Sequence, residues 1–140
     1  MPRFLPDASV TLAWCFEDEA SAWTDRLLVR LKSGDQATVP AHWPVEVANA
    51  LLVAIRRGRI TREKGTRFLE DLRALPIQVD PKSTESAFDR VFTLAEQHRL
   101  TIYDAAYLEL AVRENLPLAT LDSDLQKAAR AAGVILIEQS

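Results

Sequence analysis

Short apolar runs alternate with longer segments of helical periodicity along the chain, with no internal repeat or long linker. The longer segments predict helices near residues 8–16, 19–32, 44–57, 61–74, 82–98, 102–114 and 123–132. Strands that are separated by helices cannot pair as hairpins. We therefore expect an α/β fold, with a mostly parallel four- to five-stranded sheet flanked by about seven helices. The strands are predicted at Arg3 to Leu5, Ala37 to Val39, Ile77 to Val79, Leu116 to Thr120 and Val134 to Ile137.

The expected element boundaries carry suitable terminal residues. Pro44 suits the first position of a helix, Gly58 and Gly133 suit helix ends, and Thr61 and Thr101 suit N-caps. Pro6 is unusual at the end of the first strand because it has no backbone amide to donate. We expect the strand to stop pairing there, or Pro6 to lie beside an unpaired position.

Composition narrows the class of protein. A chain of 140 residues and 15.7 kDa fits a single domain, expected over residues 1–140. With 48% hydrophobic and 26% charged residues it is neither disordered nor fibrous, and a net charge of -3 argues against a broadly basic nucleic-acid coat. The single cysteine, Cys15, excludes an internal disulfide, and no apolar stretch is long enough to span a bilayer. We therefore expect a soluble cytoplasmic protein.

Acidic residues gather where a parallel sheet would bring them together. Asp7 follows the first apolar run, and Asp122 and Asp124 follow the run that ends at Leu121. Glu46 and Asp104 stand in the first turns of predicted helices. The carboxyl ends of parallel strands and the starts of the following helices share one edge of the sheet. We therefore expect these five carboxylates to converge.

Asp104 is the most informative of these acids. The segment from Ile102 to Val112 is otherwise apolar or aromatic except for Glu109, so the helix should be buried nearly all round. A buried carboxylate is costly unless it is paired or bound to a metal ion, and no basic residue lies within one helical turn of Asp104. Clustered carboxylates favour hard divalent ions, so we predict a Mg2+ or Mn2+ site.

Each acid also has a simpler interpretation. Glu46 and Asp104 suit the positive end of a helix dipole, and Asp122 suits an N-cap. Capping does not, however, require acids both at the ends of strands and on a nearly apolar helix. The joint placement of the five acids therefore favours a metal site.

Other residues with possible functions are less specific. A basic cluster between residues 56 and 67 could contact the phosphates of a nucleic acid or could form a solvated helix end and turn. Cys15 and Tyr107 are interpreted as core residues, Trp23 and Trp43 as interface or groove residues, and neither histidine has catalytic spacing. The basic cluster consists of Arg56, Arg57, Arg59, Arg62, Lys64 and Arg67.

Four segments contain these acids, in the order Pro6-Asp7-Ala8-Ser9-Val10, Pro44-Val45-Glu46-Val47-Ala48-Asn49-Ala50-Leu51, Tyr103-Asp104-Ala105-Ala106-Tyr107-Leu108 and Ala119-Thr120-Leu121-Asp122-Ser123-Asp124-Leu125. In this order they resemble the PIN-domain ribonucleases, and among them the VapC toxins of bacterial type II toxin-antitoxin modules. The resemblance covers essentially the whole chain.

The resemblance implies a Mg2+- or Mn2+-dependent endoribonuclease that hydrolyses phosphodiester bonds of tRNA or ribosomal RNA and leaves a 5'-phosphate and a 3'-hydroxyl. It also implies a symmetric homodimer that a cognate VapB-like antitoxin neutralises. Ser9 and Thr120 would hydrogen-bond the carboxylates or the metal-bound water, or act as caps. The residues implied to be catalytic and to bind the metal are Asp7, Glu46, Asp104 and Asp122, with Asp124 as a further or supporting ligand.

Two other functions are compatible with these residues. The chain could be a PIN nuclease of RNA maturation outside any toxin pair. It could also be a non-catalytic α/β module that binds a partner through its exposed helices, with the acids serving as caps.

Overall fold

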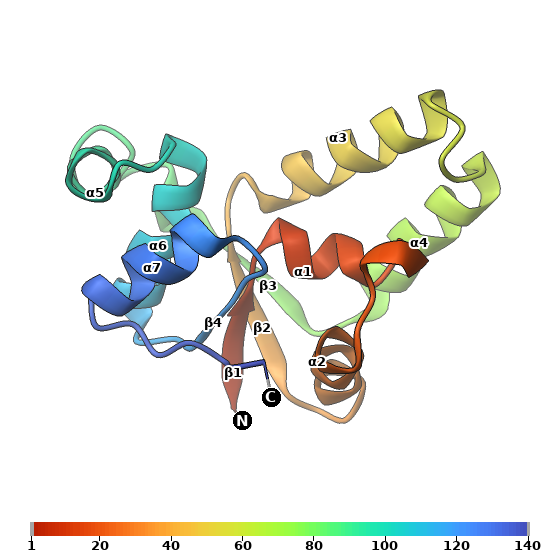
Figure 1. Ribbon diagram of the computed structural model, residues 1–140, viewed down its shortest axis with the longest axis horizontal. Coiled ribbons are helices and arrows are strands. Elements are labelled where there is room, and N and C mark those ends of the chain that lie inside the picture. Colours follow the sequence, from red (N-terminus) through yellow and green to blue (C-terminus); the bar gives the residue numbers. More distant parts are fainter. Residues whose placement is uncertain (1, 140) are drawn as a thin grey trace.

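The computed structural model describes residues 2–139, which form an α/β fold around a four-stranded parallel sheet (Figure 1). The strand order is β3-β2-β1-β4, and every neighbouring pair is parallel. The expected fold class is therefore confirmed, while the two terminal positions of the expected domain lie outside the described residues. The strands are β1 (Arg3–Pro6), β2 (Gln36–Pro40), β3 (Ile77–Asp80) and β4 (Leu118–Ala119).

In the described part of the chain, seven α-helices and two short 3-10 helices connect and cover these strands. Thr61 and Thr101 cap α4 and α6 as predicted, because their side chains accept the amides of Lys64 and Asp104. The α-helices are α1 (Ala8–Ala13), α2 (Ala22–Lys32), α3 (Trp43–Arg56), α4 (Arg62–Ala74), α5 (Arg90–His98), α6 (Ile102–Glu114) and α7 (Ser123–Ala131). The 3-10 helices are η1 (Glu17–Glu19) and η2 (Pro81–Ser83).

The helix predicted over residues 82–98 is the largest difference from expectation, since only its second half, α5, is an α-helix. Side chains hold the preceding segment in turns. Ser83 Oγ accepts the Ala41 amide at 2.7 Å, and Ser86 Oγ donates to Glu109 Oε1 at 3.2 Å. The Asp89 carboxylate then caps α5. The partners of Ser83 and Ser86 lie in distant parts of the chain, so helical periodicity alone could not reveal them.

The fifth predicted strand is also much reduced. Within residues 134–137, pairing with β4 consists of one parallel bridge between Leu118 and Leu136. The amide of Leu118 donates to Ile135 O and the amide of Ile137 donates to Leu118 O, both at 2.9 Å. Because β4 itself spans only two residues, it offers too short a partner for a full strand.

Pro6 ends β1 at a position where no amide is needed. The neighbouring amides of Leu5 and Asp7 donate to Pro117 O and Ala119 O, in the segment that forms β4, at 2.8 and 3.0 Å. On the other side of β1, the register with β2 ends at Phe4. The expectation that Pro6 lies beside an unpaired position is confirmed.

The sheet is packed on both faces. Leu5 belongs to the main core cluster and its neighbour Phe4 to a second cluster with Trp23, as the alternation of side chains along a strand requires. Trp23 and Trp43 are both buried in these clusters. The predicted interface or groove role is wrong for Trp23, whose indole fills the core, whereas Trp43 also lines a pocket between α3, α4 and β3.

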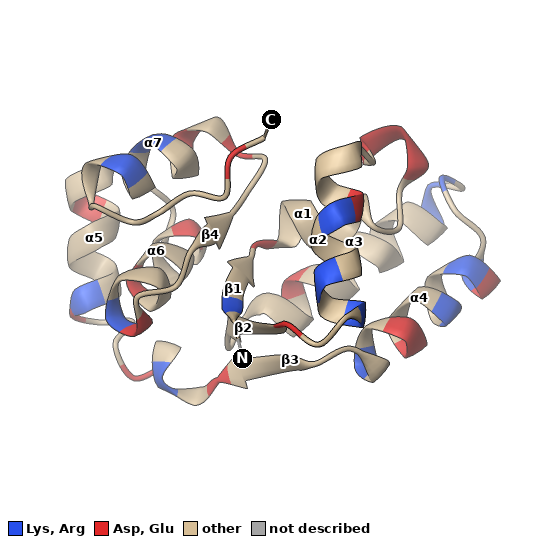
Figure 2. Ribbon diagram, turned by 90° about the horizontal axis from the view of Figure 1, so that it is seen from below, with Lys and Arg blue, Asp and Glu red and all other residues tan. Residues whose placement is uncertain are grey.

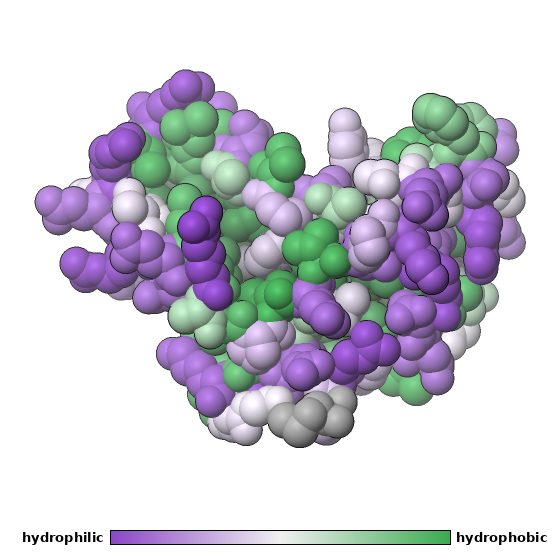
Figure 3. All heavy atoms as spheres, turned by 180° about the vertical axis from the view of Figure 1, so that it is seen from behind, coloured by the Kyte–Doolittle hydropathy of each residue, from purple (hydrophilic) through white to green (hydrophobic). Residues whose placement is uncertain are grey.

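All four strands run toward the same edge of the sheet, where α1, α3 and α7 begin (Figure 1). In the space-filling view the surface above this edge is hollowed between the part that carries α3 and α4 and the part that carries α5 (Figure 3). Within residues 2–139, no helix is long and apolar enough to cross a membrane.

Candidate active site

Asp7 is the buried centre of the candidate site. It follows β1 directly and is the N-cap of α1. Its side chain is almost completely enclosed, at 4% exposed. Oδ1 accepts hydrogen bonds from Ser9 Oγ at 2.6 Å and from the Val10 amide at 3.1 Å, and Oδ2 accepts one from the Thr120 hydroxyl. Burial outweighs these hydrogen bonds and raises the pKa of Asp7 to about 6.

Ser9 and Thr120 join Asp7 to the loop that follows β4. Besides donating to Asp7, Thr120 Oγ1 accepts the Asp122 amide at 3.0 Å, and Ser9 Oγ accepts the Leu121 amide at 3.0 Å. The hydroxyls of Ser9 and Thr120 therefore fix the position of Asp7 relative to the loop that leads to the other two aspartates at the start of α7.

Asp122 and Asp124 stand at the start of α7. Asp122 is the N-cap, and its Oδ1 accepts the Asp124 amide at 2.9 Å. The capping interpretation is therefore correct for Asp122, and Asp7 caps α1 in the same way. Capping uses one carboxylate oxygen of Asp122 and leaves Oδ2 for other contacts.

Asp104 lies in the first turn of α6, after the N-cap Thr101. The expectation that this helix is buried nearly all round is wrong at its start, because Asp104 is only partly buried and Tyr103 is exposed. The fully buried stretch begins at Ala105, since the first turn projects from the packed core. Partial burial, followed by the nearby carboxylates of Asp122, Glu46 and Asp124, raises the pKa of Asp104.

Glu46 reaches the same region from the first turn of α3. Its Oε1 accepts a hydrogen bond from the Tyr107 hydroxyl at 2.8 Å and lies 3.5 Å from His42 Nε2. Sequence reasoning missed both neighbours. The signal for Tyr107 was its position three residues after Asp104, which places the two side chains on one face of α6.

The five acids thus surround one region, and none of them forms an ion pair with a described Lys or Arg side chain. Glu46 raises the pKa of Asp7, and three of the other acids raise that of Asp104. In residues 2–139, the ion pairs of Lys and Arg side chains are formed with other carboxylates. Mutual repulsion and burial of this kind favour a bound cation.

The donor set fits a hydrated Mg2+ or Mn2+ ion. Among the described residues, no three Asp, Glu, His or Cys side chains are close enough to enclose an ion directly. Mg2+ usually keeps several waters and binds through one or two carboxylates, so an open group of oxygen ligands suits it better than zinc.

The structure places the basic cluster at the far end of the α3–α4 pair (Figure 2). Since α3 spans 14 residues and begins at the site, its last residue lies roughly 20 Å away. Arg59 is already engaged there: it contacts Asp18 and Glu19 at 2.9 and 2.8 Å, and its guanidinium lies 3.9 Å from the centre of the Phe16 ring.

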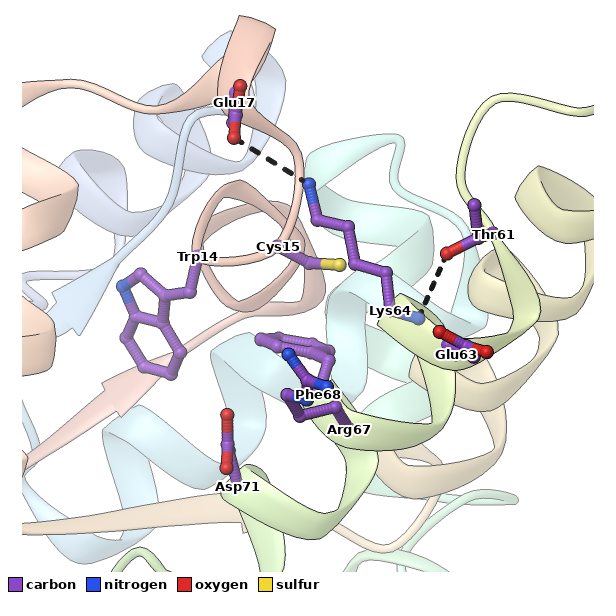
Figure 4. Close-up of a pocket in the computed structure, with 9 residues that line it drawn as sticks. All are labelled: Trp14, Cys15, Glu17, Thr61, Glu63, Lys64, Arg67, Phe68 and Asp71. Carbon is purple, nitrogen blue, oxygen red and sulfur yellow. Dashed lines mark hydrogen bonds and ion pairs between the residues drawn. The ribbon is translucent and has the colours of Figure 1, made fainter.

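A separate pocket lies beside the end of α1 and the start of α4 (Figure 4). Lys64 crosses it and forms an ion pair with Glu17 at 3.9 Å, and Arg67 and Phe68 line its wall. None of the five acids lines this pocket. It is therefore distinct from the acidic region.

Comparison with known proteins identifies the family. The model of the PIN domain matches residues 4–131. Ribonuclease VapC3 of Pyrobaculum aerophilum is 30% identical over 123 residues, which are 88% of this chain and 92% of that protein. Ribonuclease VapC12 of Mycobacterium tuberculosis is 30% identical over 122 residues, which are 87% of this chain and 88% of that protein.

Solved structures agree with the fold. The crystal structure of PAE2754 from Pyrobaculum aerophilum superposes with a TM-score of 0.67 at 25% identity, covering 91% of this chain and 84% of that one. VapBC2 from Rickettsia felis, bound to a DNA fragment from their promoter, gives a TM-score of 0.67 at 16% identity and covers 99% of both chains. The chain therefore belongs to the PIN-domain family, among its VapC-type members.

Proposed function

We propose that this protein is a metal-dependent endoribonuclease that acts as the toxin of a toxin-antitoxin pair. The observation that carries the proposal is the convergence of five carboxylates without a Lys or Arg partner at the carboxyl edge of the sheet. The relatives that are named ribonucleases support the chemistry. Acids that served only as helix caps, or as members of a structural ion-pair network, would not leave so much negative charge uncompensated in one place.

PIN-domain ribonucleases generally depend on a divalent metal ion. We propose Mg2+, or Mn2+ in its place, held by Asp7, Glu46, Asp104 and Asp122, one or two of them directly and the others through waters bound to the ion, with Asp124 as an additional ligand. When bound, the ion supplies a water of lowered pKa and stabilises charge on the leaving oxygen. The oxygen ligands and the raised pKa values of Asp7 and Asp104 support this assignment.

The protein's own residues hold this site in shape. Ser9 and Thr120 restrain the two oxygens of Asp7, and the cap formed by Asp122 restrains the loop after β4. Such preorganisation places the charges before substrate binds and avoids reorganisation during the reaction.

The substrate class that we propose is structured RNA, namely tRNA or ribosomal RNA. Arg56, Arg57 and Arg62 would hold phosphates at a distance from the cleaved bond, because the basic end of α3 lies roughly 20 Å from the acids. Arg59 is left out of this surface because Asp18 and Glu19 already neutralise it.

We further propose that the whole chain is one PIN domain that works in the cytoplasm as a homodimer, with a VapB-like antitoxin as its partner. The antitoxin is what separates this function from a PIN nuclease of RNA maturation. A short neighbouring gene whose product binds this protein and stops its cleavage would support the toxin function. If no such gene accompanies the chain, RNA maturation becomes the better explanation.

Catalysis is tested by incubating the purified protein with structured RNA and Mg2+, with EDTA and with the Asp104→Asn variant as controls. We expect cleavage only by the wild type with the metal ion, and products with 5'-phosphate and 3'-hydroxyl ends. Cleavage that persists in either control would exclude the proposed site. Wild-type protein that cleaves nothing but still binds a helical partner would indicate a non-catalytic module. Mapping cleavage ends in cellular RNA after induced expression then names the substrate.

A further inference from the structure

Tyr107 connects the core of the molecule with the acidic site. Its side chain is 1% exposed and belongs to the main core cluster together with Trp43 and Val47. Its hydroxyl group nevertheless reaches Glu46, because Tyr107 lies on the same face of α6 as Asp104. The residue is therefore both a packing element and a polar neighbour of the proposed metal ligands.

The phenol contacts two segments that carry acids. It donates to Glu46 Oε1 at 2.8 Å, and it also interacts with the backbone amide of Ala8, the residue after Asp7. One oxygen thus links the first turn of α3 with the first turn of α1. Burial, together with the carboxylates of Glu46 and Asp7, raises the pKa of Tyr107, so the phenol stays protonated and remains a donor.

The position of the Tyr107 ring is fixed independently of Glu46. The His42 ring packs against it edge-on, with ring centroids 5.0 Å apart and an interplanar angle of 72°. The Glu46 side chain, by contrast, is 39% exposed and has rotamers that lead into solvent. The buried ring of Tyr107 therefore orients the more exposed carboxylate of Glu46, and not the reverse.

We propose that Tyr107 is a positioning residue, which holds Oε1 of Glu46 and leaves Oε2 free for the metal ion or its water. This inference rests on the proposed function of the acidic site. Within residues 2–139, the phenol is the hydrogen-bond donor to the Glu46 carboxylate, so its loss would free the side chain to rotate. A ligand that must first be ordered binds its ion more weakly.

The direct test is Tyr107→Phe, which removes the hydroxyl and keeps the ring. We expect about a tenfold fall in kcat with KM changed less than twofold, since the loss concerns one hydrogen bond near the reacting groups. We also expect about a threefold or greater loss of Mn2+ affinity, measured by titration calorimetry without RNA. Tyr103→Phe is the matched control, because it makes the same change on α6 at a side chain that is 64% exposed. The control should leave kcat and Mn2+ affinity unchanged.

A double-mutant cycle distinguishes positioning from a structural role. In a Glu46→Ala background there is no carboxylate to orient, so Tyr107→Phe should change Mn2+ affinity by less than twofold. An equal loss with and without Glu46 would overturn the inference, as would losses explained by a fall in the folded fraction. If the wild type cleaves no RNA, the proposed function fails. If it cleaves RNA and Tyr107→Phe matches it in kcat and Mn2+ affinity, only the role of Tyr107 fails.

Discussion

Two buried carboxylates of this protein have opposite surroundings. Glu109, in the middle of α6, is completely buried, and Arg113 donates to both of its oxygens at 3.0 and 2.9 Å. Arg113 also binds Asp80 at the end of β3, at 2.6 Å. Asp7 is nearly as buried, but its donors are two hydroxyls and one amide. A guanidinium compensates Glu109, whereas no positive group within residues 2–139 forms an ion pair with Asp7.

The comparison shows that burial of an acid does not identify a functional site. The Glu109–Arg113–Asp80 network ties α6 to β3 and gives both carboxylates a cationic partner, which is typical of a structural network. Asp7 and Asp104, by contrast, have raised pKa values, to which burial contributes most and repulsion from the neighbouring acids adds. The missing countercharge is therefore the functional signal, because a bound cation can supply it.

The largest expected effect concerns an acid of the uncompensated group. Asp104→Asn should reduce kcat by at least about a hundredfold, because a lost metal ligand removes several kcal/mol of transition-state stabilisation. The thermal midpoint should not fall, since the change relieves repulsion from Asp122 and Glu46. Single-turnover cleavage and a thermal melt measure the two quantities. Asp25→Asn, at an exposed position of α2, is the control. An Asp104→Asn variant that cleaves at a third of the wild-type rate would contradict the assignment.

The compensated group should respond in the opposite way. Glu109→Gln should lower the free energy of unfolding by about 3 kcal/mol, because it removes the buried countercharge of Arg113. Cleavage per folded molecule should stay within about twofold. Urea denaturation gives the stability, and activity at a temperature where the variant is folded gives the second quantity. Undiminished stability would show that the network is not structural.

Asp7→Asn tests the raised pKa directly, in the presence of EDTA. The folded protein holds a proton on Asp7 up to about pH 6, whereas the unfolded chain releases it near 3.8. The contribution of Asp7 to stability is therefore greatest at low pH and falls as pH rises through about 6, by up to about 3 kcal/mol.

The Asp7→Asn variant should lack this component and equal or exceed the wild type in stability at pH 7. Urea midpoints from pH 4 to 7.5 provide the measurement. The same pH dependence in both proteins would assign the effect to another group.

The metal ion should act as the missing countercharge. Saturating Mn2+ should raise the thermal midpoint of the wild type by a few degrees at pH 7.5 and much less at pH 5, where protons compete for Asp7. Asp104→Asn should weaken the response. A NaCl titration at the same ionic strength separates specific binding from screening. An equal shift at both pH values would argue against the carboxylate site.

The smallest expected effect lies at the basic end of α3 and α4. Replacing Arg56 and Arg57 with alanine should raise KM about threefold to tenfold and flatten the salt dependence of cleavage, since two phosphate contacts are lost. Arg59→Ala removes the same charge from a side chain already paired with Asp18 and Glu19, and it should change KM less. Equal effects of these variants on KM would place the RNA contacts elsewhere.

Much of the fold could be read from the sequence, because local signals carry it. The period of apolar residues located the strands and helices, and the caps at Thr61 and Thr101 are short-range hydrogen bonds between neighbours in sequence. The errors fell where distant side chains replaced local structure. Ser86 bonds to Glu109 instead of continuing a helix, and Leu136 meets a β4 too short to extend the sheet.

The sequence by itself determined which residues are acidic and which of them follow strands or begin helices, and this was enough to predict their shared edge. Tertiary structure decided which carboxylates receive a counterion. Thr120 reaches Asp7 across 113 positions and Tyr107 reaches Glu46 across 61, while Arg113 turns Glu109 into a structural residue. Such partners depend on how whole helices pack against the sheet. The local pattern of polar and apolar residues does not show which residues, far apart in sequence, will meet.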